Sequence, residues 1–513
     1  MFFAGLIAIS MSSIEIADEA VRTPAAPFAA QYLRRSVQQQ QQQQQQPDHD
    51  RPASGGAGGA PASAPSLTQP SLASAPPAPA SSCTVTAAAA AAPTSSTGGT
   101  ATEGGCQQTS NHPNGSAAGT ADTTAATAPP ASQLQGAQSG STSAVQGSLA
   151  LRALALRKLR MCICCQFLSK LGEYVEALAP ILQEGGVDTL IKLLEQHAGD
   201  PRILYDTLDA LCALLAHKRF AELFVEAGGV QLLLQIPRNQ HSFNGLSLAL
   251  YGLASLPEAF ERVCMLPNPL VDQLVQITLQ LLRSGYDAAR KNAALFLGST
   301  LHFRAVLEAF DKQGGLRQLL VSLRAGLVLL SSNDTSLDLR IERQIAHYVC
   351  HTLVQWIRAH LVLHTNSLRR PPLARPSPLN PSAPAASQPL PYKPVGDVGQ
   401  EAMDGLLWTL DVDRRLAEAF VRSPWPAVEK LLSMGGVELL LEVVMSMQPA
   451  TERPSHELIV SALQALQLAA LSPYARKAVA GTMMQQTNRP GIGILLSLAA
   501  QPTSAFLLPD YEV

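Results

Sequence analysis

Apolar residues recur at helical spacing from about residue 147 to residue 500. Two stretches show this pattern most clearly, Leu151, Leu154, Leu156 and Leu159 in the first and Leu208, Leu211, Leu214 and Leu215 in the second. Residues three, six and seven positions apart, as in the second stretch, lie on one face of an α-helix, so this stretch predicts a helix with a buried face. No segment shows the sustained apolar and polar alternation of a half-buried strand. The pattern therefore predicts an all-α fold.

A pair of glycines followed by an apolar helical stretch recurs along this region. The four pairs are Gly185-Gly186, Gly228-Gly229, Gly314-Gly315 and Gly435-Gly436. The first two pairs are 43 residues apart, and the third follows after 86 residues, which is two such steps. A degenerate copy lies midway, where Asn268-Pro269 replaces the glycines and the apolar pattern continues to Ile277. The last step is 121 residues, or two repeats of 45 once the 31 residues of 366–396 are set aside.

A period of about 40–47 residues in an all-helical chain is typical of armadillo and HEAT repeats. Each copy predicts helix, helix, Gly-Gly, helix, and we expect the glycines to supply positive φ where consecutive helices turn sharply. We assign this role to Gly229. A single copy cannot bury its apolar face alone, so neighbouring copies must stack into an α-solenoid. The alternative, that Gly-Gly merely ends ordinary bundle helices, does not explain four matching copies.

Composition sets the N-terminal part of the chain apart. Residues 36–146 are almost entirely Gln, Ala, Ser, Thr, Gly and Pro, and they include nine consecutive glutamines at Gln38–Gln46. Such a segment cannot bury enough apolar surface to offset the entropy lost on ordering, so we predict a long disordered N-terminal tail. Residues 1–35 are ambiguous and allow one short helix around Ser13–Val21.

The repeat region is predicted to contain one interruption. Residues 147–365 and 397–500 form the armadillo-like repeats, residues 366–396 a proline-rich linker between them, and residues 501–513 a tail. Pro378-x-x-Pro381 in the linker fits a generic PxxP ligand, but matches of this kind are frequent by chance.

Charge and cysteine usage exclude several classes of partner. The formal net charge is −2, from 37 basic and 39 acidic residues, so the chain lacks the basic footprint of a nucleic-acid-binding protein. No apolar run reaches the ~18 residues that a membrane span needs. Phe2–Met11 resembles a signal-peptide core but lacks a basic n-region and a clean small-residue cleavage site. The eight cysteines have no framework spacing, which favours small core residues in an intracellular protein.

The sequence contains no recognisable catalytic motif. A Walker phosphate loop, a G-x-S-x-G elbow and the protein-kinase motif set are all missing. His347 and His351 share a helix face near Cys350, but no glutamate lies between them, and we interpret them as core or surface residues. Adjacent cysteines in Cys162-Ile-Cys164-Cys165 point in different directions on a helix. We therefore predict no metal, no cofactor and no enzyme. An enzyme such as a divergent kinase remains a third class of function, and it would require nucleotide binding.

Two polar segments are candidates for contact with a protein partner. One is Arg290-Lys291-Asn292, and the other comprises Arg414, Arg415 and Arg422 together with Trp425. Solenoids bind partners along the concave face. Each candidate equally fits a solvated helix face. No tryptophan is followed by Asn four residues later, so the Trp and Asn ladder of the importin type is absent.

Four segments resemble one family. They are Glu261–Pro267, Phe303–Arg317, Pro391–Pro394 and, most specifically, Asp413–Leu432 with its sequence DRRLAEAFVRSPWPAVEKLL. Together they are similar to the armadillo-like region of the Vpr-binding protein family, close to its plant and algal members. The resemblance covers about residues 150–500 and leaves the polyglutamine segment outside.

The resemblance implies the armadillo-like half of a substrate receptor for a cullin-4 RING ubiquitin ligase, and a nuclear location. Family members continue into a LisH motif and a WD-repeat propeller that docks the ligase adaptor. This sequence shows neither before Val513, so no adaptor-binding residue carries over, and we expect either a fragment or a variant lacking the docking half. The competing interpretation is a stand-alone armadillo adaptor unrelated to ubiquitin. Substrate identity and homo-oligomer formation stay open.

Overall fold

The computed structural model describes residues 25–45, 138–330, 337–369, 392–446, 453–484 and 488–500. The chain divides into two units, Met1–Pro47 with Ala144–Val513, and Asp48–Ser143. The only described residues of the second unit are the first turns of helix α4. All that follows concerns the first unit.

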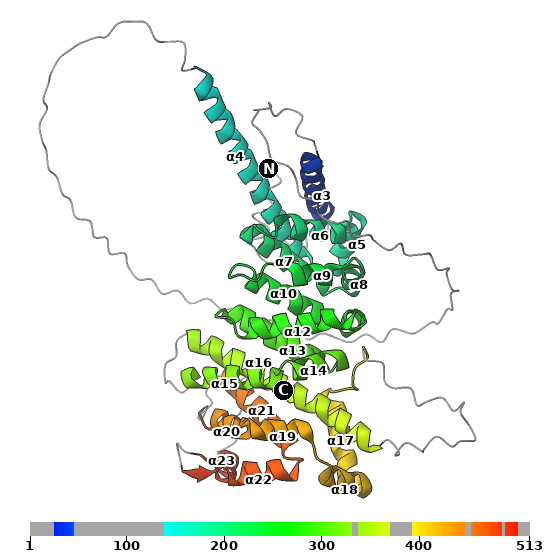
Figure 1. The fold of residues 1–513 in the computed structure, drawn as a ribbon, viewed down its shortest axis with the longest axis vertical. Coiled ribbons are helices and arrows are strands. Elements are labelled where there is room, and N and C mark those ends of the chain that lie inside the picture. The colour runs from blue at the N-terminus through cyan, green and yellow to red at the C-terminus, as the bar shows by residue number, and fades with distance from the viewer. Residues whose placement is uncertain are drawn as a thin grey trace, which may run out of the picture. The chain divides into compact units, whose positions relative to one another are not determined.

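The described residues are almost entirely helical (Figure 1). The N-terminal helices are α3 (Ala25–Gln45), α4 (Gln138–Leu171), α5 (Val175–Gln183), α6 (Gly186–His197), α7 (Pro201–Leu215), α8 (Lys218–Glu226), α9 (Gly229–Gln235), α10 (Phe243–Ala254), α11 (Pro257–Cys264) and α12 (Asn268–Leu282). The remaining helices are α13 (Asp287–Thr300), α14 (Arg304–Lys312), α15 (Gly315–Leu330), α16 (Leu337–Arg369), α17 (Gln400–Val412), α18 (Arg414–Arg422), α19 (Pro426–Ser433), α20 (Gly436–Ser446), α21 (Arg453–Ala469), α22 (Pro473–Gly481) and α23 (Gly491–Ala499).

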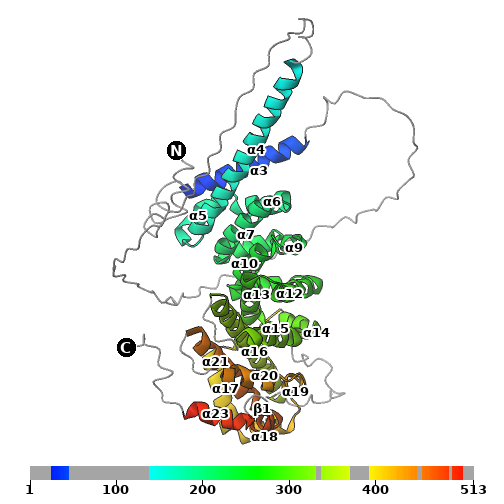
Figure 2. The same cartoon turned by 90° about the vertical axis from the view of Figure 1, so that its left-hand side faces the viewer.

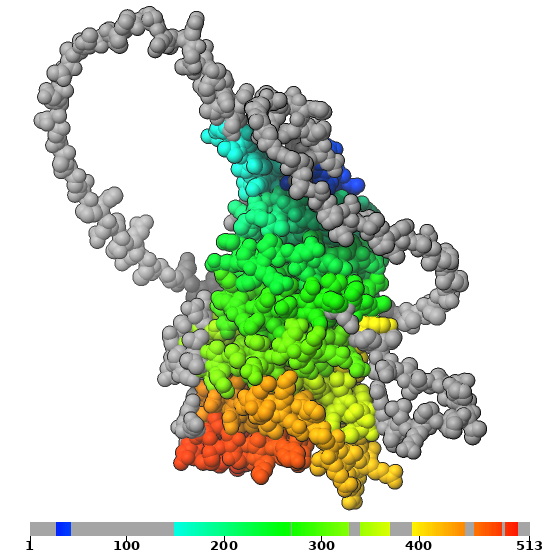
Figure 3. All heavy atoms as spheres, viewed as in Figure 1, coloured from blue at the N-terminus to red at the C-terminus, as the bar shows by residue number. Residues whose placement is uncertain are grey.

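Equivalent helices of successive repeats pack against one another in two ladders. One ladder runs α7, α10, α13, α16 and α21, and the other runs α6, α9, α12, α15 and α20. The two ladders are visible when the ribbon is turned (Figure 2), and the atoms of neighbouring repeats lie in direct contact in the space-filling view (Figure 3). One continuous cluster of buried apolar side chains joins them. The prediction of an α-solenoid of armadillo-like repeats is confirmed.

The glycine pairs connect the second helix of a repeat to the third, as predicted, but their two members have different roles. The first glycine of each pair has positive φ, which is 70° at Gly185, 81° at Gly228, 71° at Gly314 and 70° at Gly435. The second glycine begins the next helix with ordinary helical φ. The assignment of positive φ to Gly229 is therefore wrong, because Gly228 makes the left-handed turn.

The N-terminal low-complexity segment begins later than predicted. Helix α3 runs to Gln45, so the assignment of residues 36–45 to the disordered tail is wrong. Ala29, Leu33 and Val37 recur every four residues and are buried, which nucleates a helix that glutamine, a good helix former, extends at little cost. Helix α4 likewise begins at Gln138 rather than near residue 147. Residues 46–137 and the helix expected at Ser13–Val21 lie outside the described residues, as does the tail at 501–513.

The proline-rich segment is also shorter than predicted at both ends. Residues 366–369 complete helix α16. At the other end Val395 donates its amide hydrogen to the carbonyl of His302 at 2.8 Å, Lys393 forms an ion pair with Glu261, and Arg358 donates to the carbonyl of Val398 at 3.2 Å. These contacts hold residues 393–398, at the C-terminal end of the segment, against the repeats. Residues 370–391 lie outside the described ranges.

Two short strands are an addition that the sequence pattern does not reveal. Strands β1 (Met483–Met484) and β2 (Arg489–Pro490) pair antiparallel between α22 and α23. Two residues are too few to show an alternating pattern. Within the described ranges, no helix is both long enough and apolar enough to cross a bilayer.

Candidate protein-interaction site

The predicted partner-binding residues lie on α18 and at the start of α19. Asp413 caps α18, because its carboxylate accepts hydrogen bonds from the amides of Arg415 at 3.0 Å and Leu416 at 3.1 Å. The helix is amphipathic. Leu416 and Phe420 are buried, and the ring of Phe420 meets His364 of α16 edge-on at 5.0 Å. This contact orients α18 so that its opposite face is turned to solvent.

Three arginines project from that solvent face. Arg414, Arg415 and Arg422 are exposed. Arg414 Nε lies 3.1 Å and Arg422 Nη2 lies 3.6 Å from the carboxylate of Glu418. Ion pairs this exposed contribute less than about 1 kcal/mol, so a partner's carboxylates can replace Glu418 at little cost.

Trp425 does not share this surface. Its side chain is 4% exposed and stacks on the imidazole of His364, with the ring centroids 5.8 Å apart and the planes 7° apart. It also meets Phe420 edge-on at 5.4 Å. Trp425 is therefore buried against His364 of α16, and it does not lie on the exposed surface that the three arginines form. The role of these four residues in binding stays a prediction.

A surface cavity of about 420 Å³ lies between α14, α16 and α19. Its apolar lining comes from Trp356, Leu363, Trp425, Pro426 and Ala427, and its polar lining from Asp311, His360, His364 and Lys430. No local sequence pattern reveals this cavity, because its lining comes from three separate helices of the stack.

Asp311 is held by two neighbours from α16. Trp356 donates its indole N–H to Asp311 Oδ1 at 2.9 Å, and His360 Nε2 lies 2.9 Å from Oδ2. Burial alone would raise the pKa of Asp311, but the hydrogen bond and charge of His360, the hydrogen bond of Trp356 and the charge of Lys430 together lower it. The cavity therefore carries a fixed negative charge on one wall and Lys430 on another.

The cavity combines an aromatic and apolar wall with a carboxylate at Asp311 and an ammonium group at Lys430. Apolar aromatic walls with two opposite charges fit the side chain of a protein partner. The buried contact between Phe420 and His364 lies between the cavity and the exposed arginines of α18. The cavity and the arginines therefore lie at the same corner of the molecule, where α16, α18 and α19 meet.

The cysteines of the clusters noted in the sequence are buried in the core, and His347 and His351 beside them are half-buried. His347 Nδ1 lies 3.1 Å from Ser461 Oγ of α21, and Cys350 is fully buried. Burial raises the pKa of the Cys164 thiol to about 12, and that of Cys350 likewise to about 12. Across the described residues, no three His, Cys, Asp or Glu side chains gather into a metal-binding group.

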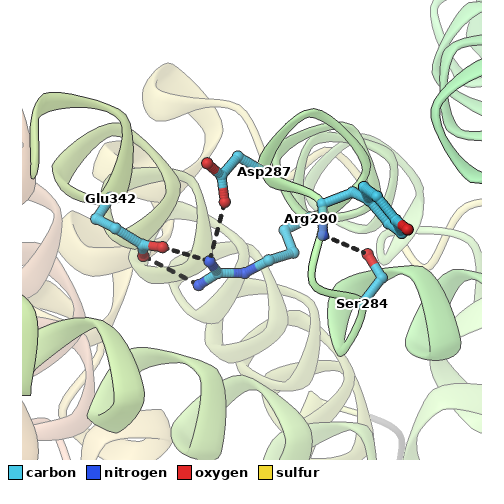
Figure 4. Close-up of polar contacts among 5 residues, drawn as sticks. Ser284, Asp287, Arg290 and Glu342 are labelled. Atoms are coloured by element: carbon cyan, nitrogen blue, oxygen red, sulfur yellow. Dashed lines mark hydrogen bonds and ion pairs between the residues drawn. The ribbon is translucent and has the colours of Figure 1, made fainter. Parts of the chain in front are cut away.

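The other polar candidate, Arg290-Lys291-Asn292, is largely internal. The guanidinium of Arg290 on α13 forms a two-pronged ion pair with Glu342 on α16, with Nη2 to Oε2 at 3.0 Å, and also contacts Asp287 at 3.4 Å (Figure 4). Asn292 is buried and donates to Ser247 Oγ at 3.1 Å. Arg290 and Asn292 therefore join neighbouring repeats rather than face a partner.

The fold defines this chain as a helical repeat protein of the armadillo-like class. The family model described as the Mahjong helical domain matches residues 1–267, and the one described as the DCAF1 helical domain matches residues 346–513. The chain belongs to the Mahjong and DCAF1 family. The resemblance noted in the sequence is thereby confirmed.

Curated relatives come from a plant and two animals. The Arabidopsis thaliana DDB1- and CUL4-associated factor homolog 1 is 38% identical over 359 residues, which cover 67% of this chain and 19% of that protein. Protein mahjong of Drosophila melanogaster is 30% identical over 352 residues, covering 66% and 22%. The Caenorhabditis elegans DDB1- and CUL4-associated factor homolog 1 is 27% identical over 210 residues, covering 40% and 12%. The chain thus spans about a fifth of the length of the first two relatives.

Proposed function

We propose that this chain is the non-catalytic, substrate-positioning part of a receptor for a cullin-4 RING ubiquitin ligase. The observation that carries the proposal is the 38% identity to a DDB1- and CUL4-associated factor homolog over 359 residues. In such a receptor the ligase's RING partner recruits the ubiquitin-charged enzyme, and this chain contributes a platform. The nucleus is the proposed place of action.

The repeat stack supports a platform role through its continuity. A single cluster of buried apolar side chains extends from α3 to α23. Close-packed interiors resist compression, so the distance between two repeats is held nearly constant. A partner held at one repeat is thus kept at a defined distance from whatever the rest of the receptor binds.

We further propose that partners dock at the corner formed by α16, α18 and α19. Arg414, Arg415 and Arg422 would attract acidic groups, and the cavity beside Trp425 would take an adjacent side chain. Exposed charges of this kind mainly set the rate of encounter, while a buried anchor sets the lifetime of the complex.

The test uses the full-length gene product, purified with the cullin-4 ligase and its adaptor. Size-exclusion chromatography reports adaptor binding, and a ubiquitination assay on co-purified proteins reports substrate positioning. Reversing the charges of Arg414, Arg415 and Arg422 should leave adaptor binding intact and reduce ubiquitination of at least one substrate. The matched control reverses Arg219, Arg238 and Arg317, which lie on other repeats. A full-length product that binds neither adaptor nor cullin would contradict the proposal and favour the stand-alone adaptor.

A further inference from the structure

The N-terminal half of α4 exposes more apolar surface than a solvated helix carries. Five of its leucines are between 42% and 69% exposed, namely Leu149, Leu151, Leu154, Leu156 and Leu159. A helix with this much apolar surface is normally covered by a partner. The C-terminal half of α4 is covered by α7, where Gln166 donates to Asp206 Oδ1 at 3.1 Å. The exposed leucines lie beyond that contact.

One side of this stretch combines leucine with arginine. At about 3.6 residues per turn, Leu149, Arg152, Leu156 and Leu159 fall on the same side of the helix. Helix α4 as a whole contains three arginines and two lysines but no aspartate or glutamate. A second copy of the same side would bring like charges together, which is unfavourable. The occupant should therefore be apolar and acidic.

Helix α17 combines an exposed tryptophan with the opposite charge. Trp408 is 66% and Val412 is 60% exposed, and they lie four positions apart on one side of the helix. The charged residues of α17 are all acidic and all exposed, namely Glu401, Asp404 and Asp411. Helix α17 therefore has the chemistry that the exposed side of α4 requires.

The two helices carry these groups at the same spacing. Arg152 and Leu156 are four positions apart, as are Asp404 and Trp408. When the two helices lie parallel and side by side, Arg152 is level with Asp404 while Leu156 is level with Trp408. Opposite charges and apolar side chains are thus matched in one register.

Helices α4 and α17 belong to distant parts of the repeat stack. Helix α4 packs on α7, the first helix of its ladder, whereas α17 packs on α18. In Figures 1 and 2, α4 lies at the N-terminal end of the stack and α17 among the C-terminal helices. Contact between α4 and α17 therefore requires two copies of the chain.

We propose that α4 of one copy of this chain packs along α17 of a second copy. Arg152 pairs with Asp404 across this contact, and Trp408 covers Leu156. The contact joins two different surfaces. Two copies therefore close into a dimer only where α4 of each meets α17 of the other, and otherwise further copies add in a row. Either assembly brings several copies of the corner formed by α16, α18 and α19 into one particle.

The test is sedimentation equilibrium of the full chain over a range of micromolar concentrations. The average mass of the wild-type chain should rise about twofold or more with concentration. An acidic α4 variant, Arg152→Glu with Arg160→Glu, should associate at least about tenfold more weakly, because like charges then face each other. A basic α17 variant, Asp404→Arg with Asp411→Arg, should be weakened in the same way.

An equimolar mixture of these two variants locates the contact. The acidic α4 of one variant then meets the basic α17 of the other, and the two unchanged helices also meet. The mixture should therefore associate like the wild-type chain, although neither variant does so alone. The control variant, Glu195→Arg with Glu258→Arg, reverses two exposed acids on α6 and α11 and should associate normally.

The apolar part of the contact is tested separately. Trp408→Ala should weaken association at least about tenfold, whereas Tyr474→Ala, at a position of α22 that is 69% exposed, should not. Three outcomes would overturn the proposal. The first is a wild-type chain that stays monomeric at every concentration, which would leave α4 to a different protein or to a lipid surface. The others are association that the basic α17 variant retains, and a mixture of the two variants that stays monomeric.

Discussion

The ring of Phe224 occupies the space that a side chain at Gly229 would need. A Cβ placed on Gly229 would lie 2.3 Å from the ring carbons of Phe224, which is the residue five positions earlier. The same spacing recurs at the other repeats, where Ile181 faces Gly186, Phe310 faces Gly315 and Leu431 faces Gly436. The second glycine of each pair is thus required by close packing, whereas the first is required by its positive φ.

Replacing these two glycines should therefore destabilise the chain by different routes. Gly229→Ala forces a methyl group into the Phe224 ring and should cost about 1–3 kcal/mol. Gly228→Ala brings the added Cβ only into ordinary contact with Gln231 Oε1 at 3.8 Å but keeps the positive φ, and should cost about 1 kcal/mol. Thermal unfolding of the single variants and of Gly229→Ala with Phe224→Leu checks this, because the smaller leucine should recover part of the loss at Gly229.

Gly405 supplies the control for the glycine series. It lies inside α17 with no atom within 4 Å of an added Cβ, so Gly405→Ala should stabilise the chain by up to about 1 kcal/mol through helix propensity. The packing explanation would be contradicted if Gly229→Ala lost as much stability with Phe224→Leu as without it, and if this loss equalled that of Gly228→Ala.

The repeat architecture could be predicted because it is periodic in the sequence, and the interaction site could not because it is assembled across repeats. Each glycine pair marks the start of a helix through two adjacent residues, so the boundary can be read from the sequence. Arg290, in contrast, forms an ion pair with Glu342, which lies 52 positions further along the chain. No local sequence pattern indicates that pairing. Trp425 follows an arginine-rich helix and so suggests a surface residue, but the histidine that buries it belongs to α16.

The Arg290 and Glu342 pair should stabilise the junction between α13 and α16. Their side chains are only 15% and 11% exposed, so Glu342→Leu leaves a shielded guanidinium with Asp287 alone and should cost about 2–3 kcal/mol. The double variant Arg290→Met with Glu342→Leu should recover most of this loss, since it leaves no unpaired charge. Denaturant unfolding measures both. Glu418→Leu, which removes exposed ion pairs, is the control and should cost less than about 1 kcal/mol. Equal costs for Glu342→Leu and Glu418→Leu would refute the stabilising role of the Arg290 and Glu342 pair.

Stability should fall as the pH is lowered below about 6.5. Burial lowers the pKa of His364, and burial followed by the charges of His347 and Arg358 lowers that of His351. A lowered pKa means that the unfolded chain binds protons first, so the stabilisation is complete above the ordinary value of 6.5 and is lost as the pH falls toward the folded values. Melting temperatures between pH 7.5 and 5 should therefore decline. Asp311, whose pKa is also lowered, adds a further loss below its ordinary value of 3.8.

His364→Phe tests the source of that decline. The variant keeps a ring against Trp425 and Phe420 but cannot accept a proton, so its melting temperature should depend less steeply on pH. His241→Gln, at an exposed position, should keep the wild-type slope. Identical slopes in all three proteins would mean that other groups control the acid response.

The buried thiols should be chemically inert in the folded chain. Burial raises the pKa of Cys164, Cys264 and Cys350 to about 12, and the thiolate is the form that reacts with alkylating reagents. In a chain carrying Cys83→Ser and Cys106→Ser, iodoacetamide at pH 8 should label these three sites only after denaturant is added. Mass spectrometry of tryptic peptides reports each site separately. Rapid labelling of Cys350 before denaturation would show that α13, α16 and α21 separate in solution, and would remove the basis for treating the repeat stack as a rigid platform.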